Sequence, residues 1–298
     1  GQVVPPHDQA IIREVRGVGG FDNVRAMPFD EAQAKGLIKI IGREVDEAFL
    51  EQVQATCLSP EICQRQGSKL KIVYTPLHGT GATLVPEALR RRGFQQVIVV
   101  PEQAVPDGDF PTVKTPNPEE GSALRMGIEL ARKEGADLVV GTDPDADRVG
   151  IAVRRPDGEY ELVTGNRIAA LLIHYICEQL TARGQFPKNA VMLTTIVSGD
   201  LMKNIARSYG AEVVEVLTGF KWIAEKMEQY DRAGSPGRPS KQFIFGAEES
   251  YGYLPAAFVR DKDAVSSTAF IADVAALAAE QGIGLHGLLQ SLFKRFGY

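Results

Sequence analysis

The chain has 298 residues, of which 44% are hydrophobic and 24% charged, values typical of a globular protein long enough for two domains. A net charge of −5 gives no electrostatic support for nucleic-acid binding, and no apolar run is long enough to cross a membrane. The three cysteines, Cys57, Cys63 and Cys177, lack metal-ligand spacing and indicate reduced thiols in a cytoplasmic protein. The N-terminus has neither a signal-peptide pattern nor an initiating Met, so we expect a fragment of a longer protein.

Hydrophobic patterns typical of strands and helices alternate along most of the chain. Helical periodicity and glycine stops predict helices at 9–15, 43–54, 84–92, 121–134, 166–183, 200–209, 220–230, 264–280 and 285–296. Apolar runs predict strands at 70–74, 96–100, 136–140, 149–153, 190–197, 212–217 and 242–245. This order predicts an α/β fold class: two tandem α/β domains with mixed, partly parallel sheets. We place the domains at residues 41–157 and 158–298 and regard residues 1–40 as too short to own a core.

Two loops of the first half contain glycine or proline residues that determine how the backbone can turn. Residues 75–81 (TPLHGTG) connect a predicted strand to a predicted helix, so they form either an anion-binding loop or an ordinary tight turn. Neither a Walker A pattern nor a G-x-G-x-x-G fingerprint after a strand occurs. Residues 115–119 (TPNPE) form a rigid loop, because each of the two prolines restrains the residue before it.

The most informative stretch is residues 143–148 (DPDADR), which joins two predicted strands. Asp143, Asp145 and Asp147 place three carboxylates in one tight loop, where they repel each other unless a cation neutralises them. Oxygen ligands of this kind suit a hard divalent cation, above all Mg²⁺. The guanidinium of Arg148 beside such a metal favours phosphate chemistry.

The same loop has three other interpretations. A solvated acidic turn remains open, and so does a phosphatase-type Asp-x-Asp at a strand end, although Asp147 is unusual for that class. A calcium-binding EF-hand is excluded, because Arg148 stands where that loop needs Gly and Arg154 where it needs Glu.

The second half contains further polar groups at predicted strand ends. They are Thr218, Gly219, Lys221, Glu248, Glu249, Ser250, Arg260 and Lys262. Carboxylate and hydroxyl groups of this kind can pair with sugar hydroxyls, and the fixed positive charges suit phosphate. Each group also has an ordinary explanation as a strand cap, a helix N-cap or a solvated charge cluster. Their common position at carboxyl ends of strands favours a binding site.

These motifs resemble those of the α-D-phosphohexomutases, particularly the bacterial phosphoglucomutase/phosphomannomutase branch that shares features with phosphopentomutases. The family's metal loop D-G-D-G/A-D-R is similar to DPDADR, with Pro144 in place of Gly. Its sugar loop G-E-x-S resembles residues 246–250 with Ala247 inserted. The segments TPLHGTG, TPNPEE, LTGFKWI, EESYGYL and VRDKDAV complete the resemblance, which covers nearly the whole chain.

The resemblance implies the fold of the family's second and third domains, with residues 1–40 as the C-terminal tail of the first. Family members interconvert hexose 1-phosphate and hexose 6-phosphate through a phosphoserine and a bisphosphorylated sugar. The serine loop T-A-S-H-N-P and the phosphate-binding loop R-x-S-G-T are absent from this sequence. We therefore expect the intact enzyme to be a mutase and the chain itself to be inactive, with no catalytic nucleophile of its own.

By the same resemblance, Asp143, Asp145 and Asp147 would bind Mg²⁺ and Arg148 would support them. The substrate-binding residues implied are Thr218, Gly219, Lys221, Glu248, Ser250, Arg260 and Lys262. The expected partners are glucose 1-phosphate, glucose 6-phosphate and glucose 1,6-bisphosphate, with mannose phosphates as a second choice, and neither nucleic acid nor membrane. A phosphopentomutase, a Mg²⁺-dependent phosphatase and a non-catalytic sugar-phosphate-binding fragment are the alternatives.

Overall fold

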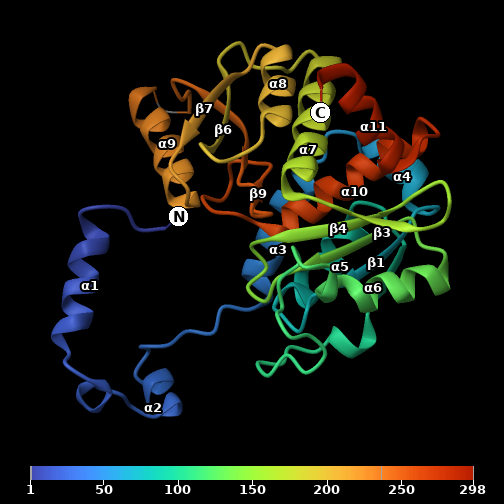
Figure 1. The fold of residues 1–298 in the computed structure, drawn as a ribbon. Helices are drawn as coiled ribbons and strands as arrows, with labels where there is room; N and C mark the ends of the chain where they lie inside the picture. The colour runs from blue at the N-terminus through green and yellow to red at the C-terminus, as the bar shows by residue number, and fades with distance from the viewer. Residues whose placement is uncertain (1, 236, 298) are drawn as a thin grey trace.

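The computed structural model describes residues 2–235 and 237–297. It contains two sheets, each of which belongs to its own α/β domain (Figure 1). The strands are β1 (Lys71–Thr75), β2 (Gln96–Val99), β3 (Leu138–Thr142), β4 (Val149–Arg154), β5 (Tyr160–Val163), β6 (Ala190–Thr195), β7 (Glu212–Val216), β8 (Gln242–Ala247) and β9 (Tyr253–Leu254). The helices are α1 (His7–Gly17), α2 (Phe29–Ala34), α3 (Arg43–Ala55), α4 (Pro60–Gly67), α5 (Gly81–Arg91), α6 (Gly121–Glu134), α7 (Gly165–Ala182), α8 (Asp200–Ser208), α9 (Phe220–Ala233), α10 (Ala264–Glu280) and α11 (Gly284–Phe296).

Both sheets are mixed, as the sequence predicts. The first has the order β2-β1-β3-β4-β5, in which β1 runs parallel to β2 and β3, whereas β4 is antiparallel to β3 and β5. The second has the order β7-β6-β8-β9, in which β6 runs parallel to β7 and β8, and β9 is antiparallel to β8. The parallel strands bring their carboxyl ends to one edge of each sheet, where Asp143 follows β3, Thr218 follows β7 and Glu248 follows β8. Arg260 and Lys262 do not have the predicted position, because they lie between the antiparallel β9 and α10.

Helix α10 lies between the two sheets and joins their cores (Figure 1). Every residue from Ala264 to Ala278 is buried, which is the pattern of a helix packed on all sides. Its small side chains allow close contact with α4, α5 and α7. The helix begins at Asp263, whose carboxylate accepts hydrogen bonds from the backbone N–H groups of Val265 and Ser266.

None of the described helices alone has the length and apolar character needed to cross a membrane. The consecutive helices α10 and α11 meet these criteria together, by length and composition, but the axis bends by 86° between them.

Two short helices, α2 and α4, and two short strands, β5 and β9, are not among the elements that the sequence pattern predicts. Helix α4 spans eight residues and has a polar composition, so its periodicity is weak. It is held by packing: Cys63 is fully buried, and a Cβ on Gly67 would lie 2.3 Å from the carbonyl oxygen of Gly93. Tertiary contacts rather than local preference therefore define this helix.

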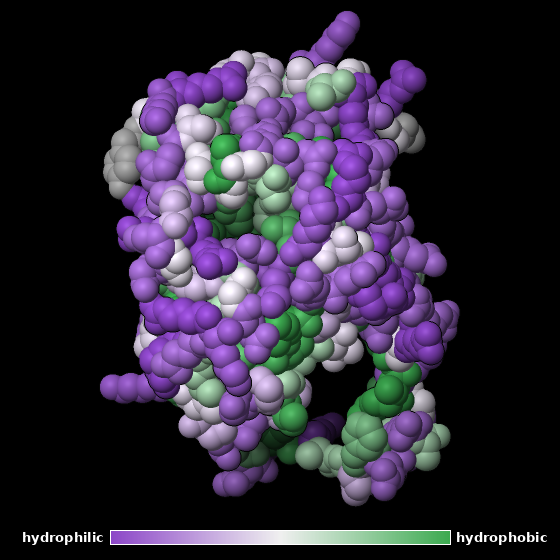
Figure 2. All heavy atoms as spheres, turned by 90° about the vertical axis from the view of Figure 1, so that its right-hand side faces the viewer, coloured by the Kyte–Doolittle hydropathy of each residue, from purple (hydrophilic) through white to green (hydrophobic). Residues whose placement is uncertain are grey.

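Residues 2–40 form an arm whose helix α2 stands apart from the body, while the beginning of the arm lies beside α9 (Figure 1). Of the described residues before Gly42, Ala32 alone is buried, and α1 buries none of its side chains. The exposed apolar residues of the arm include Ile11, Ile12, Val15, Phe21 and Leu37. Figure 2 shows apolar side chains on a lobe that is separated from the body by an opening, at the height of α2 in Figure 1.

Candidate active site

The predicted metal loop connects β3 to β4 and is seated on the loop that follows β1. The backbone N–H of Thr80 donates to the carbonyl of Pro144 at 2.8 Å. A Cβ on Gly79 would lie 2.3 Å from the Cα of Pro144, so only glycine permits this approach. Ala146 takes a φ of 56°, which lets the chain reverse between Asp145 and Asp147.

The three carboxylates of the loop lie together but differ in exposure. One oxygen from each of Asp143, Asp145 and Asp147 lies within 4.8 Å of the others. Asp145 is exposed and Asp147 half-buried, whereas Asp143 is only 1% exposed. This is a donor set of hard oxygen ligands with one side open to solvent, which fits Mg²⁺.

Asp143 also organises the loop itself. Its Oδ1 accepts the backbone N–H groups of Asp147 and Arg148 at 3.0 and 2.9 Å, and its Oδ2 accepts Arg148 Nε at 2.7 Å. Burial nevertheless raises the pKa of Asp143 to about 6, because desolvation disfavours the ionised carboxylate more than these bonds favour it.

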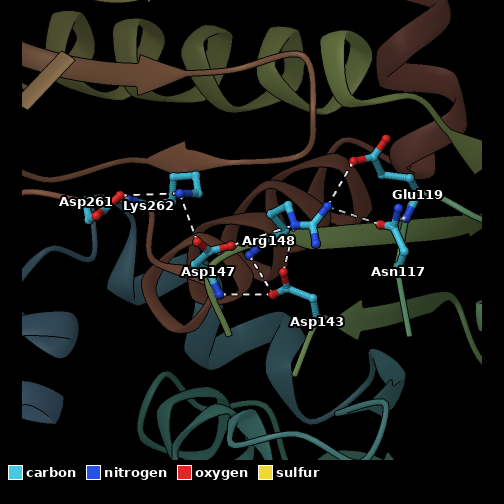
Figure 3. Close-up of polar contacts among 7 residues, drawn as sticks. All are labelled: Asn117, Glu119, Asp143, Asp147, Arg148, Asp261 and Lys262. Carbon is cyan, nitrogen blue, oxygen red and sulfur yellow. Dashed lines mark hydrogen bonds and ion pairs between the residues drawn. The ribbon is translucent and has the colours of Figure 1, made fainter. Parts of the chain in front are cut away.

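Arg148 connects the metal loop to the rigid loop at residues 115–119, as Figure 3 shows. Its Nη1 lies 3.3 Å from Glu119 Oε1 and 3.5 Å from Asn117 Oδ1. Asn117 Oδ1 also accepts the backbone N–H of Glu119 at 3.1 Å, which fixes the turn. The sequence reasoning did not name Asn117 and Glu119 as site residues, although the proline-rich motif that contains them marked the loop as rigid.

The metal loop is joined directly to the second domain through Lys262. The Nζ of Lys262 lies 2.8 Å from Asp147 Oδ2, and the side chain is 11% exposed (Figure 3). Burial favours the neutral amine, but the hydrogen bond and charge of Asp147 outweigh it, so the pKa of Lys262 lies above its ordinary value.

Backbone contacts reinforce this junction. Arg148 and Gly252 form an antiparallel bridge, and the N–H of Val149 donates to the carbonyl of Tyr251 at 3.1 Å. A Cβ on Gly252 would lie 2.3 Å from Cδ of Lys262, so a larger residue here would displace the Lys262 side chain from its position beside Asp147. The predicted metal loop and the predicted sugar loop are therefore neighbours.

Adjacent carboxylates of the sugar loop point to different partners. Glu248, which is 5% exposed, accepts the N–H of Gly219 on Oε1 at 2.9 Å, and burial raises its pKa. Its Oε2 has no hydrogen-bond partner among the residues that the structure describes. Glu249 Oε2 instead accepts the hydroxyls of Thr195 at 2.9 Å and Ser198 at 3.3 Å, at the end of β6.

The remaining predicted binding residues are placed less closely together. Thr218 is exposed and Ser250 is partly exposed, next to Gly219 and Glu248 respectively. Lys221 Nζ lies 3.6 Å from Asp8 Oδ2 on the arm. Arg260 lines the same open hollow of about 590 Å³ as Lys262, but its guanidinium pairs with Asp231 at 2.6 Å.

Comparison with known proteins assigns the two domains. The alpha/beta/alpha domain II of phosphoglucomutase/phosphomannomutase matches residues 47–158, and domain III matches residues 164–296. A phosphoglucomutase from Staphylococcus epidermidis is 39% identical over 271 residues, which are 91% of this chain and 47% of that protein. The chain thus spans about half the length of that relative.

Solved structures share the fold at lower identity. A phosphoglucomutase/phosphomannomutase family protein from Burkholderia thailandensis superposes with a TM-score of 0.61 at 18% identity, over 83% of this chain and 46% of its own. The N-acetylphosphoglucosamine mutase of Aspergillus fumigatus, in complex with GlcNAc-6P and magnesium, gives 0.55 at 13% identity, over 83% of this chain and 53% of its own. The chain belongs to the α-D-phosphohexomutase superfamily and comprises its domains II and III, as its motifs predict.

Proposed function

We propose that this chain is the metal- and sugar-binding part of an enzyme that interconverts hexose 1-phosphate and hexose 6-phosphate, with glucose as the sugar and mannose as the second choice. The observation that carries the proposal is the direct junction of the two loops, through the pair Lys262–Asp147 and the bridge Arg148–Gly252. A carboxylate cluster for a cation and polar groups for a sugar then share one side of the molecule.

Asp143, Asp145 and Asp147 would hold Mg²⁺, which supplies neutralisation of the negative charge on a phosphoryl group when bound. Arg148 holds Asp143 and the loop that contains Asn117 and Glu119, so it fixes the carboxylates in place. The Aspergillus fumigatus mutase, which shares this fold, is described in complex with magnesium, and this supports the choice of metal.

Glu248 would accept a sugar hydroxyl on its Oε2, while the N–H of Gly219 holds Oε1. Ser250, Thr218 and Lys221 would contact the same ligand, and Lys262 and Arg260 would attract its phosphate groups. The hydroxyls of a hexose present donors that a buried carboxylate binds well. We take glucose 1-phosphate, glucose 6-phosphate and glucose 1,6-bisphosphate as the partners.

Metal binding is tested with Asp145→Asn. This side chain is exposed and makes no hydrogen bond or ion pair among the described residues, so the substitution should leave the melting temperature unchanged. We expect the affinity for Mn²⁺ or Mg²⁺, measured by electron paramagnetic resonance or calorimetry, to fall by about tenfold. The control is Asp200→Asn on α8, where the side chain is 83% exposed. Equal metal affinity in Asp145→Asn and wild type would refute the metal assignment.

Sugar binding is tested on the chain itself by ligand-observed NMR with glucose 1,6-bisphosphate. Fructose 1,6-bisphosphate is the control, because it carries two phosphates on a different ring. Preferential binding of the glucose compound supports the proposal, and equal binding of both contradicts it. The same measurement with mannose 6-phosphate and ribose 1-phosphate ranks the hexose and pentose alternatives.

The chain alone should not turn over glucose 1-phosphate, because its sequence lacks the serine loop that would donate the phosphoryl group. A coupled assay for glucose 6-phosphate checks this, and turnover by the purified chain would contradict it. A cytoplasmic location is part of the proposal. It is supported by the three unpaired cysteines.

A further inference from the structure

Two cysteines lie in contact at a position that the proposed site does not use. Cys57 is half-buried in the connection between α3 and α4, and Cys63 is fully buried on α4. Their sulfur atoms are 3.8 Å apart. Cys57 lies outside both helices, and its backbone N–H donates to the carbonyl of Gln54 at the end of α3 at 3.2 Å, which leaves its side chain free to rotate.

Charged groups surround this pair of thiols. The Sγ of Cys63 donates to Asp273 Oδ1 at 3.2 Å, and Asp273 forms an ion pair with Arg92 in which both side chains are fully buried. The interaction with Cys63 and the positive charge of Arg92 lower the pKa of Cys57 to about 6, although burial opposes this. The interaction with Cys57 and burial raise the pKa of Cys63. Cys57 therefore resembles a nucleophilic thiolate, and Cys63 a neighbouring protonated thiol.

The third cysteine, Cys177, shows what burial alone does to the pKa of a thiol in this chain. Cys177 is fully buried on α7, and burial alone raises its pKa to about 12. It offers a matched thiol in the same chain with neither a neighbouring cysteine nor a nearby guanidinium among the causes of its shift.

A metal ion is a weaker interpretation of the same cluster. One ligand atom each from Cys57, Cys63 and Asp273 lies within 4.8 Å of the others. The guanidinium of Arg92 nevertheless occupies the other oxygen of Asp273, and it brings a positive charge to the place where a cation would sit. This environment favours thiolate chemistry over cation binding.

We propose that Cys57 and Cys63 form an oxidisable dithiol that a hydroperoxide converts to an intrachain disulfide. The Cys57 thiolate attacks one peroxide oxygen, the O–O bond breaks, and Cys57 becomes a sulfenic acid while the other oxygen leaves as hydroxide, or as alkoxide from an organic hydroperoxide, and takes a proton from solvent. The sulfur of Cys63 then attacks the sulfur of Cys57, its S–O bond breaks, and the hydroxyl leaves as water with the proton of Cys63. The peroxide is reduced and the two thiols are oxidised.

Closure needs the sulfur atoms to approach from 3.8 Å to the disulfide bond length of about 2.05 Å. Rotation of the Cys57 side chain, which is half-buried, would supply this movement. Oxidation would also remove the hydrogen bond from Cys63 to Asp273, a residue of α10. The modification would thus act on the helix that begins beside Lys262.

The test treats the reduced chain with hydrogen peroxide, blocks remaining thiols with iodoacetamide under denaturing conditions, and measures the intact mass. We expect the loss of two of the three free thiols and their recovery with dithiothreitol. Cleavage after Glu61 should yield the Cys57 and Cys63 peptides linked to each other. Three free thiols, a disulfide to Cys177, or a disulfide between two chains would overturn the proposal.

Single cysteine variants show which thiol is oxidised first. Cys63→Ser should stop at a sulfenic acid on Cys57, trapped by dimedone, whereas Cys57→Ser should keep both remaining thiols reduced. Cys177→Ser should form the disulfide like wild type. If Cys177 oxidises as fast as Cys57 in the folded wild-type chain, the special environment of Cys57 is refuted.

Discussion

The neighbouring carboxylates Glu248 and Glu249 allow sugar binding and structural support to be separated by one pair of variants. Replacing Glu248 by Gln keeps an oxygen that accepts the N–H of Gly219, so the loop should hold its conformation. It removes the charge from the group proposed to bind a sugar hydroxyl. A hydrogen bond to a charged group contributes about 1.5–3 kcal/mol.

That loss corresponds to a rise in Kd of about tenfold to hundredfold for glucose 1,6-bisphosphate. Glu249→Gln is the matched control, since Glu249 Oε2 accepts the hydroxyls of Thr195 and Ser198. It should lower the free energy of unfolding by about 1 kcal/mol, because two hydrogen bonds lose their charged acceptor, and it should leave Kd unchanged.

The assay is Kd by ligand-observed NMR and the free energy of unfolding by urea denaturation, both on the same three proteins. The expected pattern is weaker binding with normal stability for Glu248→Gln, and normal binding with lower stability for Glu249→Gln. A Glu248→Gln protein with unchanged Kd and reduced stability would refute the reasoning, because Glu248 would then serve the loop alone.

Three further variants test the physical account of the fold. Gly79→Ala should destabilise the chain by about 1–3 kcal/mol and weaken Mn²⁺ binding, because the new Cβ meets Pro144, whereas Gly108→Ala, with nothing within 4 Å, should be neutral. Asp273→Asn should lower the free energy of unfolding, measured by urea denaturation at pH 8, by about 3–5 kcal/mol, since it leaves the buried guanidinium of Arg92 without a charged partner. A loss below about 1 kcal/mol would show that Asp273 is neutral in the folded protein. Burial lowers the pKa of His174 to about 4, so the unfolded chain binds more protons than the folded chain between pH 6.5 and 4. The free energy of unfolding of wild type relative to His174→Gln should therefore fall by about 3 kcal/mol as the pH falls through that range. A difference that stays constant with pH would contradict this.

Local sequence signals predicted the elements that have clear ends. The helices at 121–134 and 264–280 have the predicted bounds, because Gly135 adopts a left-handed conformation after the first and Asp263 caps the second. The inner strands β3 and β6 were equally predictable from their continuous apolar runs, since every residue of both strands is buried. The short helix α4 was missed because its burial depends on contacts with distant residues.

The arrangement of the site could be predicted only in part. The loop at residues 143–148 concentrates its carboxylates locally, so their proximity follows from the sequence alone. The pair Lys262–Asp147 joins residues far apart in the chain, and only the folding of α10 between the sheets brings them together. Arg260 is a polar residue whose partner, Asp231, no local pattern indicates.

The charges at the junction explain why the proposed site would need a cation before it could accept a phosphate. The carboxylates Asp143, Asp145 and Asp147 are contacted by two positive groups, Arg148 at 2.7 Å and Lys262 at 2.8 Å, and these two groups also pair with Glu119 and Asp261. Five carboxylates therefore share two cations, and the cluster has an excess of negative charge that repels a phosphate dianion. A divalent cation would offset most of this excess and would place a positive charge beside the dianion. Because Lys262 comes from the second domain, the charge that completes this balance depends on the two domains being joined at α10.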